Sequence, residues 1–241
     1  MSARPDPLAF LTGALSDKPY PGGVGLPGTG AKFTTDGAVQ IWPGNTFLCH
    51  VIRPSPAFTA MMELQERLKR SPFANFFVHL PAPSFHMTVF QGMSPGDQGT
   101  PNWPADVPED AARDTVTEVL RARVDKVCLP PLSIKATGLF CGNSLTIAGR
   151  DAAEEAKMRG ARETLRTATG MSPEGFENYG FHITLGYLLH WLSPATAAEL
   201  VAYSDETFAL YEDALQDIPL APCAFCNFDT MHHFEELMIL R

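Results

Sequence analysis

Two histidines of this 241-residue chain stand in nearly identical contexts, and histidine is the side chain best suited to acid–base chemistry near neutral pH. His86 follows Phe and precedes Met-Thr-Val, and His182 follows Phe and precedes Ile-Thr-Leu. In a strand, residues i and i+2 point to the same side, so Thr88 shares a face with His86 and Thr184 with His182. We therefore predict two strands, each with an apolar face and a face that carries an imidazole and a hydroxyl group.

Two such faces on opposite sides of a cleft could perform an in-line displacement at phosphorus. A neutral imidazole would take a proton from the nucleophile and a protonated one would give a proton to the leaving oxygen. The hydroxyl groups of Thr88 and Thr184 would donate to non-bridging phosphate oxygens. The purely structural alternative is a pair of buried histidines beside threonines that favour strands. The matched contexts favour the functional interpretation.

A second pair of similar segments indicates an internal repeat. Residues 44–48 (GNTFL) resemble residues 142–146 (GNSLT), and a predicted helix separates each from its histidine motif. Two strand–helix–strand units facing each other would give a bilobed α+β protein, with two mainly antiparallel sheets around a central cleft.

The apolar periodicity predicts the elements that position these motifs. Ser-Pro pairs at residues 55–56 and 193–194 are typical helix starts. Helices are expected at 56–70, 109–124, 151–169 and 194–215, and strands at 46–52, 76–80, 85–91, 132–140, 144–149, 180–189, 221–228 and 234–240. Arg159, Arg162 and Arg166 are predicted to lie on the solvated side of their helix. Residues 1–40 form a Pro- and Gly-rich N-terminal extension, and residues 41–241 are predicted to form a single domain.

Composition restricts the partners. With 18 Lys and Arg against 27 Asp and Glu, the net charge of −9 argues against binding long nucleic acid but allows a small anion at one site. The short apolar run Leu8–Leu15 is flanked by acidic residues and is not interpreted as a signal segment, and no run has the length of a membrane span. Five cysteines, an odd number, are typical of reduced thiols. We therefore expect a cytoplasmic protein with no membrane partner.

The paired histidine motifs resemble those of the two-histidine (2H) phosphoesterase superfamily, which includes RNA 2′,3′-cyclic phosphodiesterases and ligase-like relatives. The resemblance covers Thr46–Phe228, and the chain looks most like an uncharacterised bacterial branch. It implies a bilobed α+β fold and catalysis without metal or cofactor. His86 and His182 would be the acid–base pair, and Thr88 and Thr184 the phosphate ligands. In relatives the second histidine often acts as the base in hydrolysis, which would make His182 the base and His86 the acid.

The expected function is therefore hydrolysis of a cyclic or linear phosphodiester of a small nucleotide or an RNA end. One alternative is a module that binds a nucleotide or phosphorylated ligand in the same cleft without turnover. Another is a metal-dependent hydrolase with both histidines as ligands, although neither motif has a carboxylate at metal-binding spacing. Lys32, Trp42 and Trp103 are candidates for contact with a nucleoside.

Overall fold

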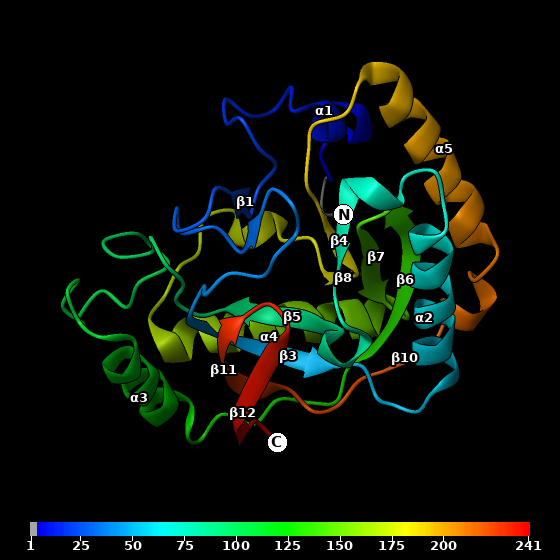
Figure 1. The fold of residues 1–241 in the computed structure, drawn as a ribbon. Helices are drawn as coiled ribbons and strands as arrows, with labels where there is room; N and C mark the ends of the chain where they lie inside the picture. Colours follow the sequence, from blue (N-terminus) through cyan, green and yellow to red (C-terminus); the bar gives the residue numbers. More distant parts are fainter. Residues whose placement is uncertain (1–3) are drawn as a thin grey trace.

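The computed structural model describes residues 4–241 and has the predicted α+β class (Figure 1). The helices are α1 (Pro7–Thr12), α2 (Pro56–Lys69), α3 (Arg113–Val124), α4 (Ala152–Thr169) and α5 (Pro194–Ala209). The strands are β1 (Val24–Gly25), β2 (Phe33–Thr34), β3 (Gly44–His50), β4 (Phe77–His79), β5 (His86–Gln91), β6 (Ser133–Phe140), β7 (Ser144–Gly149), β8 (His182–Thr184), β9 (Gly186–Leu188), β10 (Ile218–Pro219), β11 (Ala224–Thr230) and β12 (His233–Ile239).

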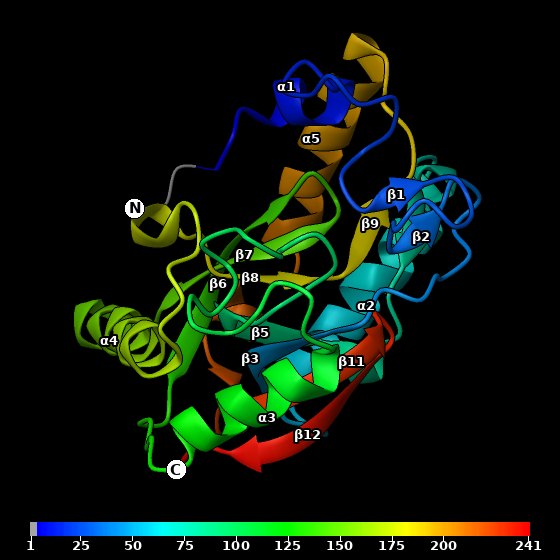
Figure 2. The same ribbon diagram turned by 90° about the vertical axis from the view of Figure 1, so that its left-hand side faces the viewer.

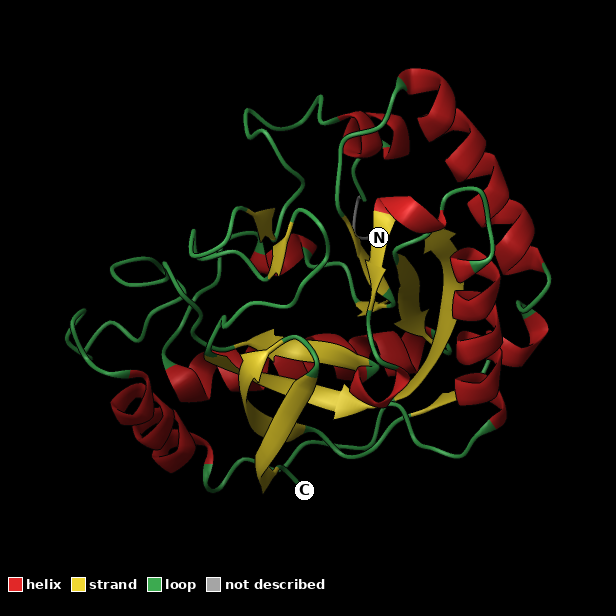
Figure 3. Cartoon of the chain, in the orientation of Figure 1, coloured by secondary structure: helices red, strands yellow, loops and turns green. Residues whose placement is uncertain are grey.

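Eight strands form one antiparallel sheet in the order β10-β6-β7-β8-β5-β3-β11-β12. The sheet is curled (Figure 3). The two halves meet where β5 pairs with β8 through Met87 and Ile183. The bilobed α+β organisation is confirmed, and the two sheets expected from the sequence are the two halves of this sheet. They are continuous because the histidine strands pair with each other.

The sequence repeat corresponds to two strand–helix–strand units, β3–α2–β5 and β7–α4–β8. In both units the histidine strand runs antiparallel to the first strand. Local caps fix the helix starts: the Ser55 hydroxyl accepts a hydrogen bond from the Phe58 amide (3.1 Å), and the Asp151 carboxylate accepts one from the Glu154 amide (2.9 Å).

Helices cover the sheet on the side away from the cavity described below. α4 packs against β5 and β7 and so spans the junction of the two halves, while α5 packs against β6 and α2 against β10 (Figures 1 and 2). The apolar faces of the histidine strands pack toward this helical layer; Phe85, Met87, Phe181 and Ile183 are each at most 1% exposed. No helix in the described part of the chain is long and apolar enough to cross a membrane.

The prediction that Arg162 lies on the solvated side of its helix is wrong. Arg159 and Arg166 pair with acidic residues at the helix surface, but Arg162 is only 2% exposed. Its guanidinium donates a hydrogen bond to the Val89 carbonyl (2.6 Å) and lies 3.9 Å from the ring centre of Tyr179. It is buried because α4 packs directly on β5, where the Val89 carbonyl and aromatic rings surround the side chain.

Other differences concern the boundaries of elements. The strand expected at 180–189 is two strands, since β8 belongs to the large sheet whereas β9 pairs with β4. The change occurs at Gly186, where a β-carbon would lie 2.7 Å from the Val78 carbonyl oxygen. The helix expected at 109–124 begins at Arg113, and the one expected at 194–215 ends at Ala209.

Residues 4–43, here called the N-terminal arm, pack along the body of the protein. α1 lies against α5, and Leu11 and Phe33 are fully buried. β1 and β2 form a small parallel sheet beside β9 (Figure 2). Near its end the arm is held to β11, since the Trp42 amide donates to the Asp229 carbonyl (2.8 Å).

Candidate active site

All four residues of the histidine motifs line one cavity of about 180 Å³ on the face of the sheet opposite α4. Because Met87 pairs with Ile183 in an antiparallel ladder, the register brings His86 next to Thr184 and Thr88 next to His182. The two imidazoles therefore lie diagonally across the junction, with a hydroxyl group beside each. The cavity is also lined by Lys32, Trp42, Asn45, Thr46, Leu80, Gln91, Gly92, Ser94, Asp97, Asn102, Tyr179, Tyr187, Phe228, Met231 and Phe234.

The two imidazoles are held in the same way. Nδ1 of His86 is 2.7 Å from the Ser84 carbonyl oxygen, and Nδ1 of His182 is 2.8 Å from the Gly180 carbonyl oxygen. Since a carbonyl oxygen can only accept, each Nδ1 carries a proton and donates it. Nε2 of each neutral ring then carries the lone pair, and within residues 4–241 it has no hydrogen-bond partner. Both rings are thus fixed in the tautomer that a general base at Nε2 requires.

Burial lowers the pKa of His86 from 6.5 to about 4, and the Ser84 carbonyl opposes this shift. The nearby imidazoles of His50 and His182 and the ammonium group of Lys32 lower the pKa further. Burial also lowers the pKa of His182, with smaller contributions in the same direction from Arg4 and Lys32. Both imidazoles are therefore neutral at pH 7 in the ligand-free protein, and an anion bound between them would raise both pKa values.

One wall of the cavity combines aromatic rings with a single cation. The Lys32 ammonium group lies 4.2 Å from the ring centre of Trp42 and 5.4 Å from that of Tyr187. Trp42 in turn stacks on Phe228, with ring centres 5.7 Å apart. Trp103, the third residue considered for nucleoside contact, lies outside the lining, where its indole N–H donates to the Val107 carbonyl (2.9 Å).

The loop after β5 supplies a polar wall. The Asp97 carboxylate accepts hydrogen bonds from the Ser94 amide (2.7 Å) and hydroxyl (2.6 Å) and from the Asn102 side-chain amide (3.1 Å). This orientation leaves the Asn102 side-chain oxygen as a buried acceptor with no partner among the described residues. This polar wall was not predicted from the sequence, because a loop has no hydrophobic periodicity. The one local signal in the loop is the Ser-x-x-Asp turn at residues 94–97.

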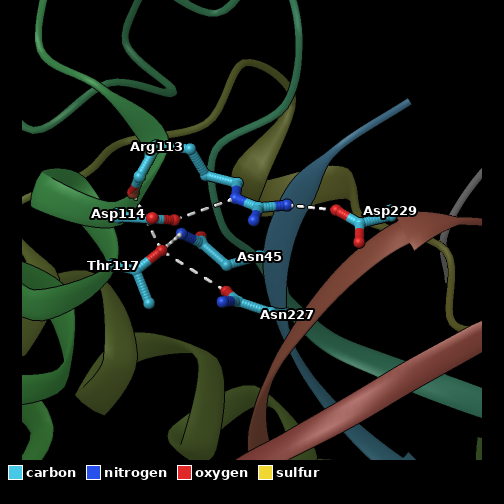
Figure 4. Close-up of polar contacts among 6 residues, drawn as sticks. All are labelled: Asn45, Arg113, Asp114, Thr117, Asn227 and Asp229. Carbon is cyan, nitrogen blue, oxygen red and sulfur yellow. Dashed lines mark hydrogen bonds and ion pairs between the residues drawn. The ribbon is translucent and has the colours of Figure 1, made fainter. Parts of the chain in front are cut away.

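A polar network surrounds the side chain of Asn45, which lines the cavity (Figure 4). The Asn45 side-chain oxygen accepts from the Met93 amide (2.9 Å), and its nitrogen donates to the Thr117 hydroxyl (3.2 Å). That hydroxyl also lies 3.3 Å from the Asn227 side-chain oxygen, and Arg113 forms an ion pair with Asp229 beside it. The network joins α3 to β3 and β11 and fixes the Asn45 side chain.

The part of the chain that the structure describes contains no group of three or more His, Cys, Asp or Glu side chains arranged to hold a metal ion. In the cavity, the one carboxylate among the lining residues, that of Asp97, is committed to its loop.

The chain is similar to a family model and to solved structures. Residues 32–143, which include His86 but not His182, match the family model described as "2H-phosphodiest", a domain of unknown function (DUF1868). The whole chain is similar to the crystal structure of ATU0111, a conserved protein of unknown function from Agrobacterium tumefaciens, with 30% identity and a TM-score of 0.89. That similarity covers 99% of this chain and 100% of the other. No curated protein matches the sequence.

Proposed function

This chain belongs to the same family as the Agrobacterium protein ATU0111, and from that premise and the geometry of the cavity we propose that it is a metal-independent phosphodiesterase acting on a small nucleotide or an RNA end. The observation that carries the proposal is the matched pair of imidazoles. His86 and His182 reach one cavity from adjacent antiparallel strands, and each has its Nδ1 bound to a carbonyl and its Nε2 free. The partial match to a 2H-phosphodiesterase-like family model supports the same class of reaction.

In the proposed reaction, water attacks phosphorus on the side opposite the leaving oxygen. One neutral imidazole takes the water proton at Nε2, and the other, protonated at Nε2, gives its proton to the leaving alkoxide. A P–O bond forms to water and the P–O bond to the alcohol breaks, so the products are a phosphomonoester and an alcohol. Thr88 and Thr184 donate hydrogen bonds to the non-bridging oxygens, where negative charge increases.

Burial lowers the pKa of both histidines: that of His86 falls to about 4, and that of His182 is also lowered. Neighbouring cations lower both pKa values further. The two imidazoles are therefore alike in the direction of their pKa shifts, and the assignment of roles rests on the resemblance to the superfamily. We keep His182 as the base and His86 as the acid.

The size and lining of the cavity support a nucleotide end as substrate. Its volume of about 180 Å³ is below the range of roughly 300–1,000 Å³ of pockets that enclose drug-sized ligands. It therefore suits a phosphodiester and its nearest sugar, with the rest of the substrate outside. The free acceptor of Asn102 would pair with an N–H or O–H group of the nucleoside.

The test is a screen of 2′,3′-cyclic nucleotides and of linear 2′,5′ and 3′,5′ dinucleotides for product. We expect His86→Ala and His182→Ala each to lose at least about a hundredfold in kcat/KM, the usual contribution of a general acid or base. His190→Ala, at an exposed position outside the cavity, is the matched control and should keep full activity. EDTA should have no effect. Full activity in either variant, or loss of activity on chelation, would overturn the proposal.

A second candidate is a binding module without turnover, and the low proton affinity of both imidazoles favours it. At pH 7 the ligand-free cavity holds no protonated histidine to serve as the acid. This alternative predicts that 2′,3′-cyclic nucleotides raise the melting temperature while the ligand is recovered unchanged.

A further inference from the structure

We propose that Lys32 of the N-terminal arm is the anion-binding residue of this cavity, and that its ammonium group contacts the non-bridging oxygens of the phosphodiester bound between His86 and His182. The inference rests on the proposed function, since it adds a substrate contact to the same site. It gives the arm a direct part in substrate binding.

Lys32 is the one Lys or Arg among the described residues that line the cavity. Within residues 4–241 its ammonium group has no carboxylate partner and no hydrogen bond; its recorded contacts are the faces of Trp42 and Tyr187. Aromatic faces hold a cation without neutralising its charge. The ammonium group therefore keeps all three donors for an incoming anion.

The backbone on both sides of Lys32 is fixed. Its amide donates to the Gly23 carbonyl (2.9 Å), and its carbonyl accepts from the Gln40 amide (2.9 Å). Gly23 has a φ of +85°, and a β-carbon there would lie 3.3 Å from Cδ of Lys32 and 3.5 Å from the Tyr187 ring. The aliphatic stem thus passes through a slot that the absence of a side chain at position 23 leaves open, and this slot directs the charged end to the cavity.

The charge balance of the site gives Lys32 its role. A phosphodiester carries one negative charge, and a second develops as the five-coordinate transition state forms. The threonine hydroxyls are neutral donors, and both imidazoles are neutral in the ligand-free protein. Lys32 is the group in the lining that carries a permanent positive charge, so it offsets the charge of the bound ester and stabilises the increase during reaction.

Lys32 lines the same cavity as both histidines, and its charge acts on both imidazoles. Besides burial, the charge of Lys32 lowers the pKa of both histidines. His50 and His182 also lower the pKa of His86, and Arg4 also lowers that of His182. Arg4, another cation of the arm, is not among the lining residues and lies over the ring of Phe140, 4.8 Å from its centre. Removing the charge of Lys32 should therefore raise both histidine pKa values, whereas a merely structural contact would not.

The test compares Lys32→Met, which keeps an unbranched apolar stem, with Lys32→Arg, which keeps the charge. Lys18→Met removes the same charge from an exposed position on the same arm and is the matched control. The probes are inorganic phosphate binding by calorimetry, the imidazole titrations by NMR, and kcat/KM on whichever phosphodiester the wild type hydrolyses. Lys32→Gln is a second neutral variant in case the methionine variant does not fold.

We expect neutral variants to bind phosphate at least about tenfold more weakly, the change that corresponds to one pKa unit of interaction. Both histidine titrations should move to higher pH, and Lys32→Arg and Lys18→Met should resemble the wild type. Unchanged phosphate affinity and histidine pKa values in a folded neutral variant would overturn the proposal, even if the wild type hydrolyses phosphodiesters. If the wild type hydrolyses no phosphodiester but the neutral variants bind phosphate more weakly than it does, Lys32 is supported as the anion-binding residue and the proposed function is rejected.

Discussion

Replacing Arg162 with Met tests whether the buried guanidinium stabilises the junction of α4 with the histidine strand β5. The substitution keeps most of the side-chain volume and removes the charge. It deletes the hydrogen bond to the Val89 carbonyl (2.6 Å) and the contact with the Tyr179 ring (3.9 Å). With Arg162 only 2% exposed, water cannot replace either interaction.

The expected loss follows from two opposing effects. A buried hydrogen bond from a charged donor contributes about 1.5–3 kcal/mol, and a desolvated cation over an aromatic ring about 2 kcal/mol. Against this, burial lowers the pKa of Arg162 from 12.5 to about 10, which corresponds to a desolvation penalty of about 3 kcal/mol. The net decrease in the free energy of unfolding should be about 0.5–2 kcal/mol.

Urea unfolding at pH 7, followed by circular dichroism, measures this difference. Arg121→Met is the matched control, because Arg121 is an exposed helical arginine whose surface pair with Glu118 should contribute less than about 0.5 kcal/mol. If Arg162→Met is as stable as the control, or more stable than the wild type, the buried guanidinium does not hold α4 to β5 and the reasoning is refuted.

Two further predictions concern backbone crowding and acid stability. Gly186→Ala should lower the free energy of unfolding by about 1–3 kcal/mol in urea titrations, because its β-carbon would meet the Val78 carbonyl oxygen at 2.7 Å. The control is Gly138→Ala, which has open space around it and should lower the free energy of unfolding by less than half as much. Because the folded-state pKa of His86, about 4, lies below the ordinary 6.5, its contribution to stability is complete above pH 6.5 and is lost as the pH falls toward 4. In the wild type this loss of unfolding free energy should reach about 3 kcal/mol at pH 4. In His86→Gln the decrease in stability between pH 7 and pH 4 should be smaller by about that amount. Equal decreases in the wild type and the variant would contradict the burial of the ring.

Local signals in the sequence were sufficient for most of the fold. The alternation around His86 and His182 predicted both strands and their two faces, and the Ser-Pro pairs at 55–56 and 193–194 predicted the starts of α2 and α5. These signals succeed because strand alternation and helix capping depend on residues within a few positions of each other.

Features that depend on distant partners were not predictable. The helical pattern placed Arg162 among charged residues, whereas β5 and the segment carrying Tyr179 bury it. The split at Gly186 depends on β4, which lies more than a hundred residues earlier in the chain. The polar wall around Asn102 comes from a loop whose position depends on tertiary packing.

The order of strands in the sheet has a consequence for how the protein forms during synthesis. β3 lies between β5 and β11, and β12 closes that edge, so the half that contains His86 needs the last strands of the chain. β4, from the first unit, pairs with β9, which follows the second unit. The two units are therefore interlaced, and the half that contains His86 is completed only after the second unit has been synthesised. Such long-range pairings slow folding, and the growing chain exposes the unpaired edge of β3 until β11 emerges.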